Sequence, residues 1–135
     1  MGAGSTDFRS QLVNNGSLNV QQGQLQFGRG GSLTHSGVLT IAAGAALDFA
    51  SAAAVTSTIN TASTTVAGTL SITNDNALNF TTAHTIGGNG TFQHSFGQVT
   101  GANLTLGPDL NVVITDGGHS GAATTTVQGS TSIAS

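Results

Sequence analysis

Two stretches of the sequence decide the fold: residues 37–49, GVLTIAAGAALDF, and residues 68–80, GTLSITNDNALNF. Each begins with a glycine, and each carries two short segments in which apolar and polar residues alternate. Strict alternation is typical of a β-strand with one buried face. Because glycine or asparagine, which favour turns, separates the segments, both stretches predict short strands joined by tight corners.

The same pattern recurs in residues 16–27 and 101–112, so four blocks of the chain resemble one another. The first segments of the four blocks begin at Leu18, Leu39, Leu70 and Leu104. Repeats of several short strands are typical of a parallel β-solenoid, in which each turn pairs with the next around a continuous core. We therefore predict an all-β, parallel β-solenoid (β-helix) of about four rungs, or turns, with an antiparallel β-sandwich as the alternative.

The alternation also predicts which side chains face the core. We expect Leu39, Leu70 and Leu78 to point inward, whereas Thr69 and Ser71 should behave as ordinary surface residues. The alignment of the blocks further places Asp48 and Asn79 at equivalent, outward-facing positions of two repeats. That placement leaves no pair of stacked carboxylates.

The organisation that we predict has three parts. Residues 1–12 form an N-terminal extension or cap, residues 13–120 form the solenoid repeats, and residues 121–135 form a polar tail or a terminal strand. The segment 49–55 contains four alanines, and we expect a loop or a tight corner there.

Composition excludes several classes of protein. The chain has 135 residues, of which 5% are charged, and its formal net charge is -3. Its two arginines cannot neutralise a phosphate backbone, so we expect no nucleic-acid partner. With no cysteine the chain holds no disulfide. It has no apolar run of about 18 residues, so no transmembrane helix is expected.

Three phrases resemble the repeats of large secreted bacterial surface proteins. They are Asn-Gly-Ser-Leu-Asn-Val (15–20), Ala-Gly-Ala-Ala-Leu-Asp-Phe (43–49) and Ala-Gly-Thr-Leu-Ser-Ile (67–72). Together they are similar to the passengers of filamentous haemagglutinin and autotransporter adhesins, and the likeness covers about residues 13–112. The resemblance implies a right-handed parallel β-helix that is exported and acts as a stalk or adhesive shaft.

The acidic residues give no sign of catalysis. Glycoside hydrolysis requires two carboxyl groups facing one another, and lyases require a basic residue to take a proton. Here Asp48, Asp75, Asp109 and Asp116 are spread along the chain, and lysine is absent. Asp75 and Asp109 stand in turn-like sequences. We therefore predict that the protein is not an enzyme and has no catalytic residues.

The histidines and a glycine-rich string are the candidates for metal binding. The histidines are His35, His84, His94 and His119, and none has the spacing of a metal motif. We expect them on exposed faces or at corners. The string 87–92, Gly-Gly-Asn-Gly-Thr-Phe, has Phe92 where a calcium-binding repeat requires aspartate, so it predicts a corner. No metal, cofactor or cofactor-binding residue is predicted.

Self-association is the interaction that the sequence favours. Strands at the ends of a solenoid carry unpaired backbone groups, and little charge protects the ends of this chain. We expect either further rungs of a longer parent chain or a second copy to cover them. The expected contact joins Val127 or Ile133 of one copy to Leu12, Val13 or Leu18 of the next.

The sequence thus predicts a structural or adhesive β-helix module of a secreted or cell-surface bacterial protein. The alternative is a self-assembling extracellular fibre subunit that stacks end to end. A protein that binds or acts on polysaccharide is the third interpretation. The expected partners are accordingly the chain itself, further rungs, a host surface or a polysaccharide.

Overall fold

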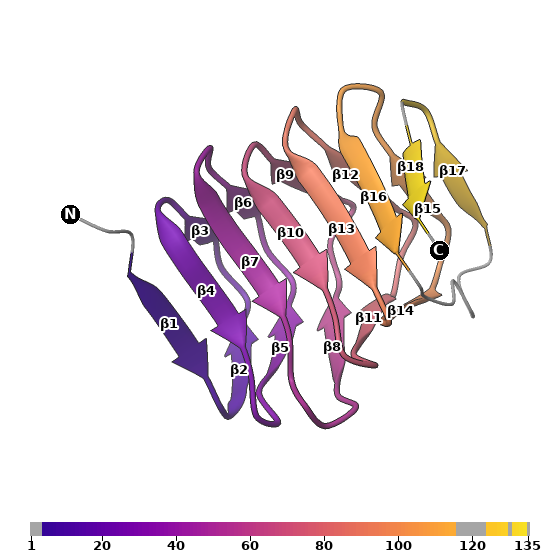
Figure 1. Ribbon diagram of the computed structural model, residues 1–135. Coiled ribbons are helices and arrows are strands. Elements are labelled where there is room, and N and C mark those ends of the chain that lie inside the picture. The colour runs from indigo at the N-terminus through magenta and orange to yellow at the C-terminus, as the bar shows by residue number, and fades with distance from the viewer. Residues whose placement is uncertain (1–3, 116–123, 130, 135) are drawn as a thin grey trace.

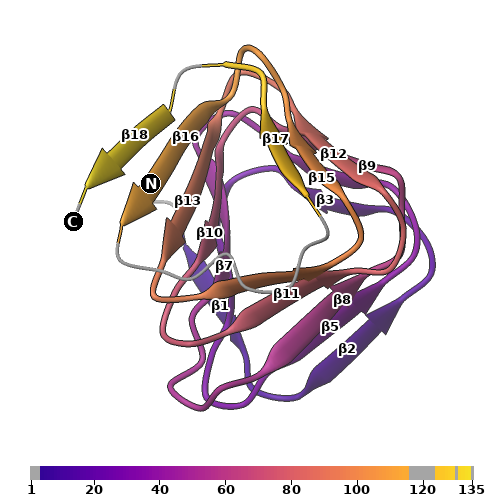
Figure 2. The same ribbon diagram turned by 90° about the vertical axis from the view of Figure 1, so that its right-hand side faces the viewer.

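The protein is a parallel β-solenoid, seen in a computed structural model that describes residues 4–115, 124–129 and 131–134, with Ile133 and Ala134 described by their backbone alone. This part of the chain contains eighteen β-strands and no helix. The strands stack along one axis as the chain coils (Figure 1). Seen down that axis, three sheets form the sides of a triangle (Figure 2).

Sheet A has seven strands and includes the first and the last strand of the described chain. Its strands, in order along the axis, are β1 (Ser5–Phe8), β4 (Gly23–Phe27), β7 (Ala45–Phe49), β10 (Thr69–Ile72), β13 (Thr91–Ser95), β16 (Asn111–Thr115) and β18 (Thr131–Ala134). Every pairing within the sheet is parallel.

Sheets B and C complete the triangle and are also wholly parallel. Sheet B contains β2 (Gln11–Asn14), β5 (Ser32–His35), β8 (Thr56–Ile59), β11 (Ala77–Phe80) and β14 (Gln98–Gly101). Sheet C contains β3 (Leu18–Val20), β6 (Leu39–Ile41), β9 (Ser63–Val66), β12 (His84–Gly87), β15 (Leu104–Leu106) and β17 (Thr125–Val127).

This architecture confirms the predicted all-β parallel solenoid and excludes the antiparallel sandwich. The expected number of turns was too low. Sheets of seven, five and six strands correspond to about six turns rather than about four. The strands of the described chain reach into both predicted terminal regions, since β1 pairs with β4, β17 with β15 and β18 with β16.

The turn count was wrong because the sequence blocks do not all begin on the same sheet. Leu18 and Leu39 are true partners in sheet C. Leu70, however, lies in sheet A, where it pairs with Leu47 and Phe92. The step from Leu39 to Leu70 therefore spans more than one turn. Similar alternating segments on all three sheets make such a shift invisible in the sequence.

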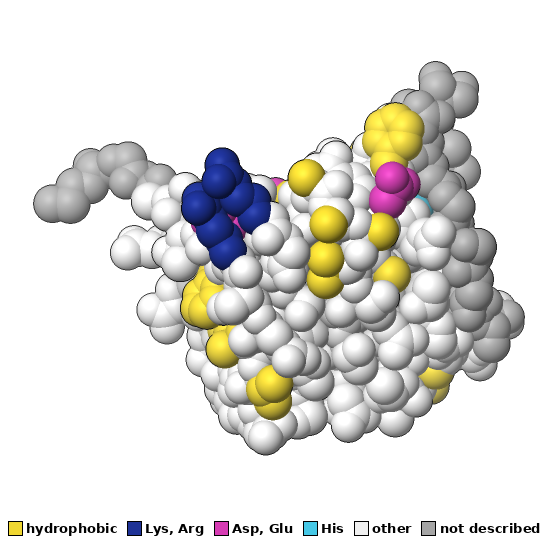
Figure 3. All heavy atoms as spheres, turned by 90° about the horizontal axis from the view of Figure 1, so that it is seen from below, with side chains coloured by type: hydrophobic (Ala, Val, Ile, Leu, Met, Phe, Trp, Pro, Cys, Tyr) yellow, Lys and Arg dark blue, Asp and Glu magenta, His cyan; other side chains and the backbone are white. Residues whose placement is uncertain are grey.

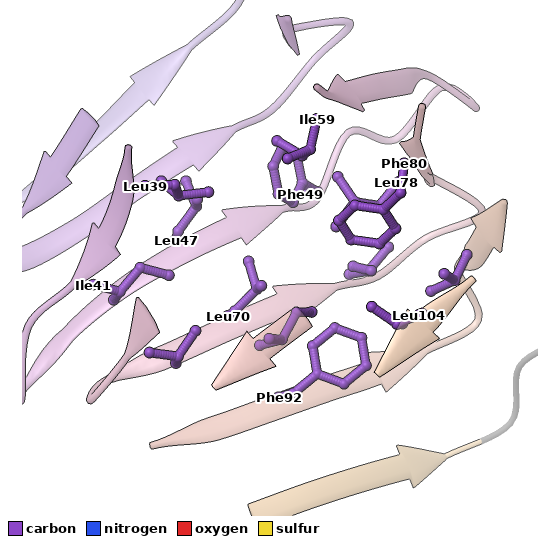
Figure 4. Close-up of a cluster of buried hydrophobic side chains, with 14 of the residues drawn as sticks. Leu39, Ile41, Leu47, Phe49, Ile59, Leu70, Leu78, Phe80, Phe92 and Leu104 are labelled. Carbon is purple, nitrogen blue, oxygen red and sulfur yellow. The ribbon is translucent and has the colours of Figure 1, made fainter. Parts of the chain in front are cut away.

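Inward side chains form continuous rows along the axis, as stacking of equivalent residues requires (Figure 4). Leu39, Leu70 and Leu78 are at most 2% exposed, which confirms their predicted inward orientation. In sheet A the rings of Phe8, Phe27 and Phe49 succeed one another, with centroids 5.7 and 5.5 Å apart. This aliphatic and aromatic column stabilises a coil that has almost no charged side chains.

Three corners join the sheets, and we name each by the sheets that it connects. At the B/C corner, successive turns approach each other most closely at one glycine. At Gly37, a Cβ atom would lie 1.9 Å from the carbonyl oxygen of Gly16 in the turn before. Only glycine fits there, because the turns approach each other through their backbones. Residues 50–55, between β7 and β8, form the non-helical A/B connection that was predicted.

Candidate functional site

The described histidines lie in the core, not on exposed faces or at corners as the sequence suggested. His35, His84 and His94 are at most 2% exposed, and they belong to sheets B, C and A respectively. Each occupies an inward position of the alternation: His94, for example, stands between Ile72 and Ile114. The described residues contain no group of three such side chains that could hold a metal ion, so these histidines do not form a common metal site. His119 lies outside the described residues.

His84 is held by two hydrogen bonds beside the B/C corner. Its Nδ1 lies 2.5 Å from the carbonyl oxygen of Thr61, which can only accept, so Nδ1 carries the proton. Nε2 lies 3.0 Å from the Thr64 hydroxyl, which therefore donates to it. The imidazole also stacks on Phe80, with centroids 4.4 Å apart. Burial lowers the pKa of His84 below its usual value of 6.5, against an opposing effect of the Thr61 bond.

Asp48 is the centre of a polar cluster on the outer side of sheet A. Gln24 donates to its Oδ2 over 3.0 Å, and the Ser71 hydroxyl donates to its Oδ1. The block alignment was wrong here, because Asp48 pairs in register with Ser71, whereas Asn79 pairs in sheet B. Ser71 is only 9% exposed, so its prediction as an ordinary surface residue was also wrong. Because both oxygens of the Asp48 carboxylate accept these hydrogen bonds, the carboxylate has a structural role.

The A/B corner is where the backbone is strained. The described non-glycine residues with positive φ are Arg29, Asn74, Asp75 and Phe96, at 49°, 56°, 58° and 57°. All four lie in connections between a strand of sheet A and a strand of sheet B. Asparagine and aspartate tolerate this conformation, but for a bulky residue such as phenylalanine it is an outlier. A non-glycine residue with positive φ lowers the stability of the folded state by on the order of 1–3 kcal/mol.

Buried polar side chains stabilise the A/B corner from its inner side. Asn76 is 3% exposed, and its amide donates over 2.9 Å to the carbonyl oxygen of Ser51 in the turn before. The Ser51 hydroxyl in turn accepts from the backbone amide of Gly30 over 2.7 Å. The Asp75 amide donates over 3.0 Å to the carbonyl oxygen of Phe96 in the turn after. Successive turns are thus linked through this corner.

A hollow of about 450 Å³ opens on the same corner. It is lined by Ala52, Asn74, Asp75 and Phe96, from three successive turns. The Phe96 side chain is 57% exposed beside the Asp75 carboxylate. An aromatic surface, a carboxylate and a primary amide are the groups by which small-molecule sites hold polar ligands. This hollow is the candidate functional site.

The sequence did not predict this site, although one signal was present. Phe92, His94 and Phe96 alternate, so periodicity alone would place all three in the core. Strand β13 ends at Ser95, however, and the chain turns before Phe96 can point inward. The glycine at position 97 marks that turn. A bulky residue directly before a glycine, at the end of an alternating run, would have indicated an exposed aromatic.

A second hollow, of about 330 Å³, lies beside β1, β3 and β4. Its lining includes Thr6, Val20, Gln22 and Leu25, and none of the residues that line it is charged or aromatic. It offers hydrogen-bonding groups without an aromatic surface. For this reason we regard the hollow at the A/B corner as the better candidate.

The residues predicted to associate lie on different sheets and do not meet within one chain. Leu12 and Val13 belong to β2, where Leu12 packs against the core and Val13 is 58% exposed. Leu18 lies in β3 of sheet C, and Val127, 37% exposed, lies in β17 of the same sheet. Ile133 pairs with Ile114 through its backbone, and its side chain lies outside the described part of the chain.

Further chemistry is sparse in residues 4–115, 124–129 and 131–134. No group of three or more histidine, cysteine, aspartate or glutamate side chains gathers there in a way that would hold a metal ion. Asp7 forms an ion pair with Arg9, with 2.7 Å between Oδ2 and Nε. No helix of these residues is long and apolar enough to cross a membrane.

Comparison with protein families, curated proteins and solved structures gave no match for this sequence. The class of protein is therefore defined by the fold alone, which is a three-sided β-solenoid whose described strand pairings are all parallel. Its candidate site is a hollow at one corner, and its lateral faces consist mainly of short uncharged polar side chains.

Proposed function

We propose that the chain is a non-catalytic structural and adhesive β-solenoid module of a secreted or cell-surface bacterial protein. The observation that carries this proposal is the uninterrupted parallel ladder, in which inward rows run from turn to turn along one axis. Such a quasi-one-dimensional stack gives a stiff shaft whose sides remain available for contact. The three phrases that resemble adhesin repeats support the same function.

Adhesion without reaction can be measured directly. Beads that carry the folded chain are passed under flow over a cultured epithelial monolayer and over polysaccharide films, with beads carrying the heat-denatured chain as control. We expect retention of the folded chain on at least one surface, and no reducing ends or unsaturated sugars in the effluent. Equal detachment of both bead types would contradict adhesion, and released sugar products would favour a polysaccharide-acting enzyme.

A second candidate function is that of a fibre subunit, which the strand counts favour. Among the described residues, sheet A has one strand more than sheet C, since β18 lies beyond β17. A copy that simply repeated the register would add its β1 to β18 and leave a gap over β17. A copy turned by one third instead adds β2 to β17 and β3 to β18. This arrangement brings Leu12 of that copy into the same sheet as Val127, as the expected contact requires.

Cysteine cross-linking tests this arrangement, because the chain has no cysteine of its own. Adjacent strands lie about 4.8 Å apart, which is within the Cα–Cα range of a disulfide. We expect an equimolar mixture of Leu12→Cys and Val127→Cys chains to form a covalent dimer on oxidation. A mixture of Val38→Cys, exposed on a lateral side, with Val127→Cys is the control. Monomers in light scattering at every concentration, or cross-links in the control alone, would contradict end-to-end stacking.

A further inference from the structure

We propose that the hollow at the A/B corner is a binding site for a neutral carbohydrate, with Phe96 as the stacking platform and Asp75 and Asn74 as partners for its hydroxyl groups. This inference deepens the adhesive function proposed above and rests on it. The site would give the shaft a defined ligand at one corner, between sheets whose outer faces are mainly polar.

The conformation of Phe96 is the first argument. Its backbone has φ of 57°, a conformation that glycine and asparagine adopt more easily. Its side chain is nevertheless 57% exposed, so packing does not compensate for the strain. A fold under selection for stability alone would place a small or polar residue here. Strained residues of this kind cluster where a ligand is held.

The rigidity of the corner is the second argument. The backbone amide of Asp75 donates to the backbone carbonyl of Phe96, and the backbone amide of Gln98 donates over 2.7 Å to the backbone carbonyl of Asn76. The buried amide of Asn76 connects the same turn to Ser51. These bonds hold in place the backbone segments that carry the Phe96 ring and the Asp75 carboxylate. A preorganised site loses little conformational entropy on binding, which favours affinity.

The chemistry of the lining is the third argument. The Asp75 carboxylate can accept hydrogen bonds at both oxygens, and the Asn74 amide can both donate and accept. A sugar hydroxyl is itself donor and acceptor, so it matches both side chains. The ring carbons of a sugar present an apolar face that suits Phe96 and the adjacent methyl group of Ala52.

The charges along the corner are the fourth argument, and they favour a neutral ligand. Arg29 lies on the same corner two turns before Asp75, which places the two charges on the order of 10 Å apart along the axis. Figure 3 shows the basic side chains at one end of this face, small hydrophobic side chains between, and an acidic side chain beside an aromatic one at the other. A polyanion would meet Asp75 and a polycation would meet Arg29 within one Debye length.

Affinity electrophoresis of the full chain tests the site with named probes. Gels contain dextran, a mannan or a galactan, and parallel gels contain heparin or polylysine as the anionic and cationic probes. We expect at least one neutral polysaccharide to retard the chain. The Phe96→Gly substitution should weaken that retardation at least tenfold, and Asp75→Asn should weaken it less. The matched control is Val38→Ala, which shortens another exposed hydrophobic side chain, at the B/C corner, and should change nothing.

The glycine variant also separates binding from folding. If Phe96 serves a ligand, Phe96→Gly loses binding while its melting temperature stays equal or rises, because glycine relieves the positive φ. A lower melting temperature with unchanged retardation would show a structural role and overturn the proposal. Retardation by polylysine alone would instead identify a cationic ligand and overturn it as well, as would the absence of retardation in every neutral gel.

The bead assay distinguishes this proposal from the function on which it rests. If beads carrying the Phe96→Gly chain are retained as well as those carrying the original chain, adhesion holds and the carbohydrate site fails. If neither bead type is retained on any surface, the adhesive function itself fails.

Discussion

The B/C corner and the A/B corner connect neighbouring sheets of one coil, yet they are built in opposite ways. The B/C connections 15–17, 36–38, 60–62, 81–83 and 102–103 have nearly constant length. The A/B connections 9–10, 28–31, 50–55, 73–76 and 96–97 have from two to six residues. The four described non-glycine residues with positive φ all lie in A/B connections, and none in the B/C connections.

The two corners also use different hydrogen bonds between turns. At the B/C corner, exposed side chains bond to the turn before: Ser36 donates to Asn15 over 2.8 Å, and Thr81 donates to Asn60 over 2.6 Å. At the A/B corner the buried amide of Asn76 makes the connection. The B/C corner also has buried support, because His84 bonds to the Thr61 carbonyl from the core, but its described residues carry no positive φ outside glycine. The irregular corner combines strain with buried polar support, and that is the combination that a binding site requires.

The largest effect should arise from neither corner but from the core. Leu70 is 2% exposed in the inward row of sheet A. We expect Leu70→Ala to lower the free energy of unfolding by about 2–5 kcal/mol, from lost transfer energy and the remaining cavity. Thr69→Ala, on the outer side of the same strand, should stay within about 0.5 kcal/mol. Urea denaturation measures both, and equal losses would mean that the corners rather than the core rows hold the coil together.

The next effect should separate the two corners. Asn76→Ala leaves the buried carbonyl of Ser51 without its donor, so we expect a loss of about 1–3 kcal/mol in the free energy of unfolding. Thr81→Ala removes an exposed bond of the B/C corner and should cost no more than about 0.5 kcal/mol. If the two losses are equal, burial does not distinguish the corners in the way that we argue.

The third effect concerns pH and belongs to the B/C side, where His84 bonds to Thr61. Burial lowers the pKa of His84 in the folded state, so the unfolded chain takes up the proton first as the pH falls below about 6.5. Stability from the neutral imidazole is therefore complete above that pH and is lost as the pH falls through the folded-state pKa. The slope for one proton is at most about 1.4 kcal/mol per pH unit.

The measurement is the free energy of unfolding between pH 7.5 and 4.5 for the original chain and for His84→Gln. Other titrating groups are present in both proteins, so their effects cancel in the difference. We expect the original chain to lose stability more steeply on acidification. Parallel curves would show that His84 titrates alike in the folded and unfolded states.

The faces of the coil were predictable, and the reason is local. Alternation around Leu39, Leu70 and Leu78 fixes which side of each strand is buried, and glycines mark where strands end. The register was not predictable, because equivalent alternation recurs on all three sheets and a shift by one sheet leaves the pattern unchanged. The misplaced pairing of Asp48 with Asn79 is one result of such a shift.

The candidate site was hidden for a related reason. Its residues come from three successive turns, so Ala52, Asp75 and Phe96 are distant in the sequence and adjacent only after the coil forms. The burial of the described histidines was also missed from the sequence. Their type suggests a surface position, whereas their place in the alternation decides that they are buried.

The smallest effect tests whether strain at the A/B corner is real and general. Arg29 is exposed and has φ of 49°, and its neighbour Gly30 already adopts positive φ. Arg29→Gly relieves the steric cost of the left-handed conformation but adds freedom to the unfolded chain, so the two effects partly cancel. We expect a net gain of about 0.5 kcal/mol in the free energy of unfolding. The matched change at the B/C corner is Ala62→Gly, at an exposed residue without positive φ, which should cost about 0.5–1 kcal/mol through the same unfolded-state entropy. Chemical denaturation of the two variants beside the original chain gives two shifts of opposite sign if only the A/B corner is strained. Shifts of the same sign would show that the two corners differ in length and composition but not in backbone strain, and the positive φ of Phe96 would then not mark a ligand site.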